Sequence, residues 1–149
     1  MDTPEIINLA RSIIRTVDIA VIIGRQILMI KRAKPPFEDL FVLPGGHVEI
    51  TDKTLAHAAA RELKEETGID VGPQRLCQLM TLDGRDRDPR PGRHISTVFT
   101  HRLMEMEEVA NCKPATDAKS IHFLDIDSLR AEQVGFDHFN VIIRLYHHR

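Results

Sequence analysis

The first part of the chain combines an amphipathic segment with two short apolar runs. Residues 4–15 repeat apolar side chains at helical spacing, so we predict a helix before the core, within residues 1–16. The runs Val17–Ile23 and Ile27–Lys31 are rich in valine and isoleucine and are separated by a three-residue turn that begins with glycine. This pattern is typical of a β-hairpin.

The rest of the chain continues to alternate between strand and helix patterns. Paired prolines within residues 33–40 indicate a loop, which leads into a short apolar strand at residues 41–43. The alanine-rich stretch from Thr54 favours a helix that stops at Gly68. Apolar runs then predict three strands and a closing helix, in the order Arg75–Leu82, His94–Leu103, Ile121–Asp125 and Phe136–Tyr146.

This order of elements predicts the fold class. Strands and helices alternate without internal repeats, low-complexity segments or a linker, so residues 1–149 are expected to form a single domain. The class is α/β (α+β), with a central mixed sheet and helices on its faces.

Composition narrows the possible functions. The chain is 42% hydrophobic and 28% charged, with a formal net charge of -2, which is ordinary for a globular protein. This charge argues against a general nucleic-acid binder, and no apolar run approaches membrane-spanning length, so no nucleic-acid and no membrane partner is expected. The two cysteines, Cys77 and Cys112, lack metal-type spacing, and we expect a reduced, cytoplasmic protein.

Three carboxylates share one face of the predicted central helix. Glu62, Glu65 and Glu66 stand at positions i, i+3 and i+4, so their side chains lie close together. They repel one another unless a hard cation lies between them, and Mg²⁺ prefers such oxygen ligands. The simpler interpretation is a solvated helix face on which the glutamates pair with Arg61 and Lys64.

The surrounding pattern favours the metal site. The stretch from Leu43 to Asp70, LPGGHVEITDKTLAHAAARELKEETGID, resembles the Nudix box, G-x5-E-x7-R-E-U-x-E-E-x-G-U, in which U is aliphatic. Its second half matches at every fixed position, namely Arg61, Glu62, Leu63, Glu65, Glu66, Gly68 and Ile69. The resemblance implies a Nudix-type α/β/α sandwich with the box helix against one face of the sheet.

The first half of the box departs from the pattern. Counted back from the arginine of the box, the position of its first glutamate holds Lys53; counted on from Gly46, it holds Asp52. The loop is therefore one residue longer than usual, and Asp52 or Glu49 is expected to substitute for the glutamate. Thr51 or Asp52 would then cap the helix, with Lys53 pointing to solvent.

Weaker signals outside the box are similar to the bacterial ADP-ribose pyrophosphatase branch of the family. They are Pro35-Pro36-Phe37, Arg87-Asp88-Pro89-Arg90, Asp117-Ala118 and Phe136-Asp137-His138. Each also has a simpler interpretation: Asp88 would shape a turn, and Phe136 would belong to the core with Asp137 as a helix cap. The chain departs from the branch at Thr116 and Ser120, where acidic residues are frequent, which favours a difference in substrate recognition.

The resemblance also implies a set of site residues. Divalent ions, Mg²⁺ with Mn²⁺ as a substitute, would be held by Glu62, Glu65, Glu66, the Gly45 carbonyl and Asp117, with Glu105, Glu107 and Glu108 as alternatives to the last. Glu62 or Glu66 would act as the general base, and Arg61 would orient the glutamates. Substrate would contact Gly46, His47, Arg87 and Arg90.

Three functions are compatible with this site. The leading one is Mg²⁺-dependent hydrolysis of a pyrophosphate bond in a nucleoside diphosphate linked to another moiety, with ADP-ribose favoured as substrate. The second is a nucleoside-triphosphate pyrophosphatase that acts on oxidised nucleotides. The third is a Nudix-fold module that binds a nucleotide metabolite without cutting it, which the lengthened loop and Lys53 motivate. In each case we expect a homodimer.

Overall fold

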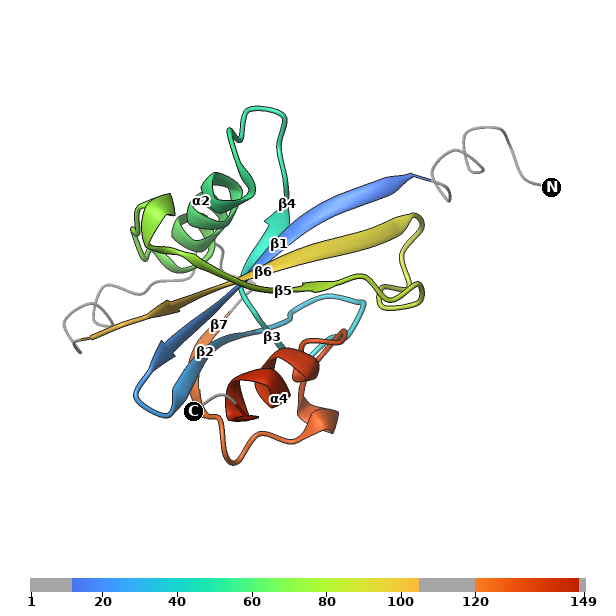
Figure 1. The fold of residues 1–149 in the computed structure, drawn as a ribbon. Helices are drawn as coiled ribbons and strands as arrows, with labels where there is room; N and C mark the ends of the chain where they lie inside the picture. Colours follow the sequence, from blue (N-terminus) through green and yellow to red (C-terminus); the bar gives the residue numbers. More distant parts are fainter. Residues whose placement is uncertain (1–11, 105–119, 148–149) are drawn as a thin grey trace.

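The computed structural model describes residues 12–104 and 120–147 and is built around a seven-stranded sheet (Figure 1). The strands are β1 (Ile13–Ile23), β2 (Gln26–Lys31), β3 (Phe41–Val42), β4 (Gly45–His47), β5 (Cys77–Leu82), β6 (Arg93–Arg102) and β7 (Ser120–Asp125). The helices are α2 (Leu55–Thr67) and α4 (Phe139–His147), with short 3₁₀ turns η1 (Pro73–Arg75) and η2 (Ala131–Gln133).

β1 is the central strand of the sheet. The strand order is β3-β2-β1-β6-β5, while β4 pairs with β1 and β7 pairs with β2. β1 and β6 run parallel along their length, from Ile13 opposite Arg93 to Ile22 opposite Arg102, and the other pairings are antiparallel. The sheet is therefore mixed, as the sequence predicts.

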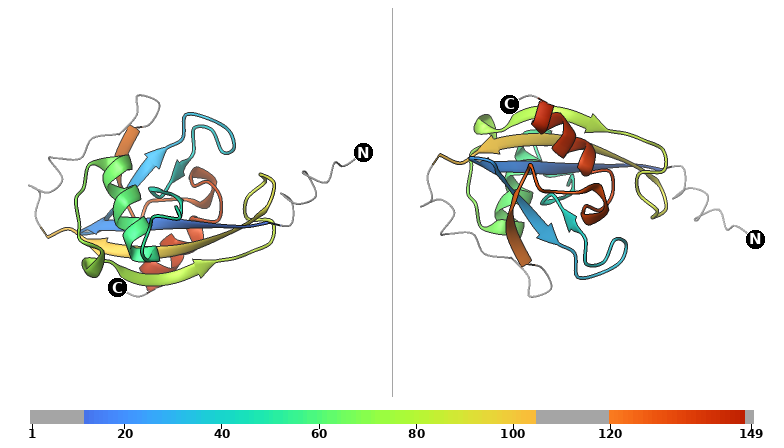
Figure 2. Two further views of the ribbon diagram at one scale, coloured as in Figure 1. Left: turned by 90° about the horizontal axis from the view of Figure 1, so that it is seen from above. Right: turned by 90° about the horizontal axis from the view of Figure 1, so that it is seen from below.

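Two helices cover opposite faces of this sheet (Figure 2). Alternate residues of β1 point to opposite sides, so Val17, Ile19 and Val21 pack into the core beneath α2, while Ala20 and Ile22 pack into the core beneath α4. Both faces of the central strand are buried, which explains why its sequence reads as a continuous apolar run. The expected α/β/α arrangement is confirmed.

The expected helix within residues 1–16 is wrong over its last residues. Ile13–Thr16 belong to β1 and pair with residues 93–96 of β6. β-Branched side chains favour a strand when a partner strand is available, and β6 extends far enough to provide one. The earlier residues of the predicted helix lie outside the described residues.

The C-terminal helix begins three residues later than the sequence predicts. Phe136 has a φ of 52°, which is incompatible with a right-handed helix, and α4 starts only at Phe139. The apolar periodicity continues through this segment because Phe136 packs against the core from outside the helix. The positive φ of Phe136 thus directs its side chain differently from that of a residue in a regular helix.

The remaining predicted elements are confirmed with small shifts of their ends. These are the β1–β2 hairpin, the loop that precedes β3, the box helix α2 and the strands β5, β6 and β7. None of the helices among the described residues has the length and apolar character needed to cross a membrane.

Candidate functional site

α2 is held in place by a cap at each end. The Thr54 hydroxyl accepts a hydrogen bond of 3.1 Å from the backbone N–H of His57, and Gly68 ends the helix with a φ of 81°. The expected cap at Thr51 or Asp52 is therefore wrong. Asp52 is unavailable as a cap because its carboxylate is bound to a side chain of the helix itself.

That side chain is Arg61, whose guanidinium group connects the helix to the preceding loop. Its Nε and Nη2 donate to the two carboxylate oxygens of Asp52 at 3.0 and 2.8 Å, and Nη2 also donates to the His47 carbonyl at 3.0 Å. Nη1 donates to Glu62 Oε1 at 2.9 Å. The hydrogen bonds that Arg61 donates to Asp52, and then the one to Glu62, raise the pKa of Arg61.

Of the two acidic loop residues that the sequence offers, Asp52 is thus the one that pairs closely with Arg61. The alternative, Glu49, approaches Arg61 only at 3.4 Å and has a half-exposed side chain, whereas Asp52 forms a two-pronged pair. The hydrogen bond from Arg61 also lowers the pKa of Asp52 and keeps it ionised. Lys53 is exposed beside it, so the extra loop residue brings no cation into the Arg61 cluster.

Glu62 is buried against the glycine turn, the Gly45-Gly46 pair that begins β4. A Cβ atom added to Gly46 would lie 2.5 Å from Glu62 Cδ, so only glycine leaves room for this carboxylate. Burial raises the pKa of Glu62, and the charges of Glu65 and Glu66 act in the same direction, while the contact with Arg61 opposes them. Glu62 is therefore a buried carboxylate whose charge the contact with Arg61 offsets only in part.

The carboxylates of this region fit a hard divalent cation. Within residues 12–104 and 120–147, no three His, Cys, Asp or Glu side chains already converge as metal ligands. The donor set is nevertheless composed of oxygen atoms, and buried Glu62 has a charge that a cation would stabilise. The groups that would hold it are those the sequence indicates: Glu62, Glu65, Glu66 and the Gly45 carbonyl. Asp117 and its alternatives Glu105, Glu107 and Glu108 lie outside the described residues.

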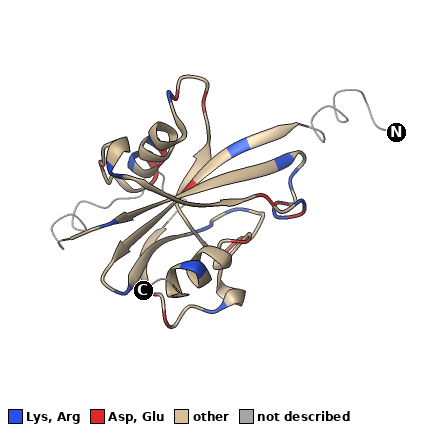
Figure 3. Ribbon diagram, in the orientation of Figure 1, with Lys and Arg blue, Asp and Glu red and all other residues tan. Residues whose placement is uncertain are grey.

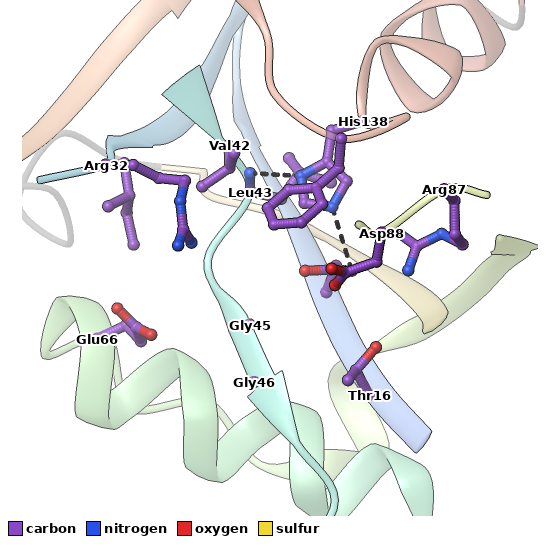
Figure 4. Close-up of a pocket in the computed structure, with 13 residues that line it drawn as sticks. Thr16, Arg32, Val42, Leu43, Gly45, Gly46, Glu66, Arg87, Asp88 and His138 are labelled. Carbon is purple, nitrogen blue, oxygen red and sulfur yellow. Dashed lines mark hydrogen bonds and ion pairs between the residues drawn. The ribbon is translucent and has the colours of Figure 1, made fainter. Parts of the chain in front are cut away.

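A cavity of about 90 Å³ opens beside the glycine turn. Figure 4 shows Glu66, from α2, and Arg32, from the loop after β2, pointing into the same space. The other walls come from β1, the β5–β6 loop and the segment that leads into α4, and they include Thr16, Asp18, Gly45, Gly46, Arg87, Asp88, Phe136 and His138. A carboxylate, a cation and an aromatic ring thus line one pocket.

Both arginines predicted to bind substrate are paired with carboxylates. The loop between β5 and β6 carries charges of both signs (Figure 3). Arg87, with a buried side chain, donates to both oxygens of Asp137 at 2.9 and 2.7 Å. Arg90 donates to both oxygens of Asp88 at 3.0 and 2.7 Å, and its pairing outweighs burial and lowers the pKa of Asp88.

Arg32 is a pocket residue that the sequence analysis missed. Its guanidinium carbon lies 5.3 Å from the centre of the Phe136 ring, and that of Arg90 lies 5.6 Å from the same centre. The Nε of Arg32 donates to the Pro36 carbonyl at 2.6 Å. Burial and then the charge of Arg90 lower the pKa of Arg32, so this site disfavours its positive charge. The one signal in the sequence is a basic residue directly after a buried strand.

His47 lies in β4, opposite Thr16 of β1, and its side chain is exposed. Its backbone carbonyl, rather than its imidazole ring, takes part in the Arg61 network. Gly46, the next predicted substrate contact, lines the pocket directly.

The fold and this site define a class of protein. The NUDIX domain pattern matches residues 13–145. The chain therefore belongs to the Nudix family, and the resemblance seen in the box is confirmed.

Individual relatives agree with this assignment. The chain is 40% identical over 117 residues to an ADP-ribose pyrophosphatase of Methanocaldococcus jannaschii, covering 78% of this chain and 63% of that protein. It is 32% identical to a bifunctional NMN adenylyltransferase/ADP ribose pyrophosphatase of Francisella tularensis solved with AMP and a manganese ion, with a TM-score of 0.75 over 93% of this chain and 42% of that one. The Nudix domain of Shewanella oneidensis NrtR, solved with ADP ribose, shares the fold with a TM-score of 0.76 at 23% identity, over 99% and 93% of the two chains. This chain thus spans less than two thirds of the length of each of the first two relatives.

The Asp52–Arg61 pair provides the first test. Asp52→Asn removes the charge that holds Arg61, so we expect the turnover rate to fall by about tenfold or more. Lys53→Glu, at the adjacent exposed position, serves as the matched control and should alter the Mg²⁺ requirement only modestly. Rates measured against Mg²⁺ concentration compare the two variants. A larger effect of Lys53→Glu would show that position 53, rather than Asp52, corresponds to the glutamate of the box.

The second prediction concerns the contribution of Glu62 to the stability of the folded protein. Because its folded-state pKa lies above the unfolded value, ionised Glu62 lowers stability once the pH exceeds the unfolded pKa, and this cost is fully present at neutral pH. Glu62→Gln should therefore leave the melting temperature of the metal-free protein unchanged or raise it by a few degrees, although turnover is lost. Thermal melts give the measurement, and the difference should shrink below about pH 4. A clearly lower melting temperature at neutral pH would contradict this account.

Proposed function

We propose that this Nudix protein is a Mg²⁺-dependent pyrophosphohydrolase that acts on a nucleoside diphosphate linked to another moiety, with ADP-ribose as the favoured substrate. One observation carries the proposal: Glu66, from the carboxylate face of α2, lines a pocket that Arg32 and Phe136 also line. The name of the archaeal relative, an ADP-ribose pyrophosphatase, supports the choice of substrate.

The residues of the site would divide the work of hydrolysis. Divalent ions bound by Glu62, Glu65, Glu66 and the Gly45 carbonyl, with Asp117 as a further ligand, would neutralise the pyrophosphate and acidify a bound water. Glu62 or Glu66 would accept the proton of the attacking water, and burial, which raises the pKa of Glu62, suits it to that task. Arg61 would act by holding the glutamates. As the water oxygen bonds to one phosphorus, the bridging P–O bond breaks and its electron pair leaves with the other phosphate.

The Arg61 cluster supports an enzyme over a binding module. The binding-module hypothesis arose from the lengthened loop, yet Asp52 pairs with Arg61 despite the extra residue. Glu62 therefore keeps its contact with Arg61. A protein that only binds nucleotides has no need of this buried carboxylate, which supports the enzyme. The Francisella relative was solved with manganese and AMP, which supports Mn²⁺ as a substitute for Mg²⁺.

A nucleotide panel tests this function. The wild-type protein with Mg²⁺ should convert ADP-ribose to AMP and ribose 5-phosphate, and Glu66→Gln or Glu65→Gln should reduce kcat by about tenfold or more. Glu132→Gln is the matched control, because Glu132 pairs with Arg130 on the surface and lies outside the pocket.

The same panel separates the two alternatives. Release of pyrophosphate from oxidised nucleoside triphosphates at a higher rate than cleavage of ADP-ribose would establish the nucleoside-triphosphate pyrophosphatase. Saturable binding of ADP-ribose without turnover would establish the binding module. Near-wild-type rates in both glutamate variants would disprove the site itself.

Arg32 is proposed as the residue that contacts a substrate phosphate or the distal ribose. Its positive charge is disfavoured by burial and by Arg90, so an anionic group in the pocket would relieve that cost. We expect Arg32→Ala to raise KM for ADP-ribose by about tenfold with a smaller change in kcat. Lys31→Ala, at the neighbouring exposed position, should change neither. An unaltered KM in Arg32→Ala would assign phosphate recognition to another residue.

Three further expectations from the sequence stay predictions. We propose a homodimer, a cytoplasmic location and no nucleic-acid partner. Arg87, Arg90 and His47 are retained as proposed substrate contacts, although the two arginines would have to bind substrate while still paired with Asp137 and Asp88.

A further inference from the structure

We infer that His138 is a positioning residue that fixes the turn Leu43–Gly46 and so controls where the Gly45 carbonyl faces the metal ions. The inference rests on the proposed function, because that function assigns a metal to Gly45. His138 lies at the far end of the sequence from the box, just before α4, yet it is 3% exposed and lines the pocket beside the turn (Figure 4).

Two contacts define the state of the His138 ring. The backbone N–H of Leu43 donates to His138 Nδ1 at 3.0 Å, so Nδ1 carries no hydrogen. The neutral ring must then hold its hydrogen on Nε2, which lies 3.4 Å from Asp18 Oδ2. One side of the imidazole accepts from the turn and the other faces a carboxylate of β1, so the ring links the two.

Asp18 continues this link to Gly45. The two residues are opposite each other in the β1–β4 pairing, and a Cβ atom on Gly45 would collide with Asp18 Oδ1 and the Val17 carbonyl. The hydroxyl of Ser96, from β6, donates to Asp18 Oδ2, the same oxygen that faces His138. Asp18 therefore has a fixed orientation against the backbone of Gly45, and His138 helps to set it.

The ring itself is held by its neighbours in the chain. Asp137 forms the two-pronged pair with Arg87, and the ring of Phe136 lies 5.4 Å from that of His138. The backbone N–H of Gly135 donates to the Phe41 carbonyl at 2.8 Å, just before the turn. Phe136 and Asp137 thus do more than pack in the core or cap the helix. Together with Gly135 they hold the His138 ring against the turn.

A buried histidine can also serve stability alone, and the two roles predict different results. A purely stabilising His138 would lower the melting temperature when replaced, without changing how the folded protein binds metal. A positioning His138 would change metal affinity in folded protein, and the change would depend on which of its two contacts the replacement keeps.

Three variants of the full chain separate its two contacts. His138→Leu removes both, His138→Gln can keep a donor toward Asp18, and His138→Asn can keep an acceptor for the Leu43 N–H. Mn²⁺ binding to metal-free protein is measured by calorimetry well below each melting temperature, with circular dichroism to confirm folding. We expect His138→Leu and His138→Gln to weaken Mn²⁺ binding by about tenfold and His138→Asn to recover much of the loss.

His101→Leu is the matched control. His101 is also a buried histidine, 6% exposed, but it belongs to β6, opposite Val21, and does not line the pocket. Whatever its effect on the melting temperature, this variant should leave Mn²⁺ affinity unchanged. In activity assays, the Mg²⁺ concentration for half-maximal rate should follow the same order as Mn²⁺ binding, with kcat changing less.

Each outcome bears on the inference. Unchanged Mn²⁺ affinity in all folded His138 variants, or equal losses in His138→Asn and His138→Gln, would overturn it. If His138→Leu does not fold, the comparison of His138→Asn with His138→Gln still decides. A third outcome separates the two proposals: the variants follow the expected order of Mn²⁺ affinity, but the wild-type protein cuts no nucleotide. That result would refute the proposed enzyme while upholding the role of His138.

Discussion

The guanidinium group of Arg61 is the interaction on which the site depends. It binds the Asp52 carboxylate, the His47 carbonyl and Glu62, so a single side chain joins the loop, the glycine turn and the helix. A delocalised cation with five donors in a plane can do this, and a lysine cannot. Because Arg61 lies between carboxylates that would otherwise repel one another, it allows Glu62 to remain close to the backbone of Gly46 in the absence of metal.

Local patterns in the sequence predict much of the fold and the helix-borne half of the site. The hairpin of β1 and β2, the end of α2 at Gly68 and the shared face of its glutamates all follow from spacing within a few residues. The errors occur where a distant partner decides. Residues 13–16 become strand because β6 lies beside them, and α4 starts late because Phe136 turns into the pocket with a positive φ.

The other half of the site depends on contacts that no local pattern contains. Asp52 pairs across the loop, Arg32 reaches the Phe136 ring 104 positions away, and His138 binds the Leu43 N–H at a separation of 95 residues. Conversely, Arg87 and Arg90 look available in the sequence, yet the fold gives each a carboxylate. Charged residues are easily recognised in a sequence, but the partner that neutralises each one becomes visible only in three dimensions.

The loop between β4 and α2 has a consequence for how such proteins vary in length. It closes on itself, since Asp52 accepts from the Glu49 N–H at 2.8 Å and returns its own N–H to the Glu49 carbonyl at 3.0 Å, while Ile50 protrudes fully into solvent. An insertion at this tip would leave the Asp52–Arg61 pair in place, because the carboxylate is anchored from the helix side. The segment is therefore a natural position for insertions, and a search that demands fixed spacing between glycine and acid would discard proteins whose geometry is intact.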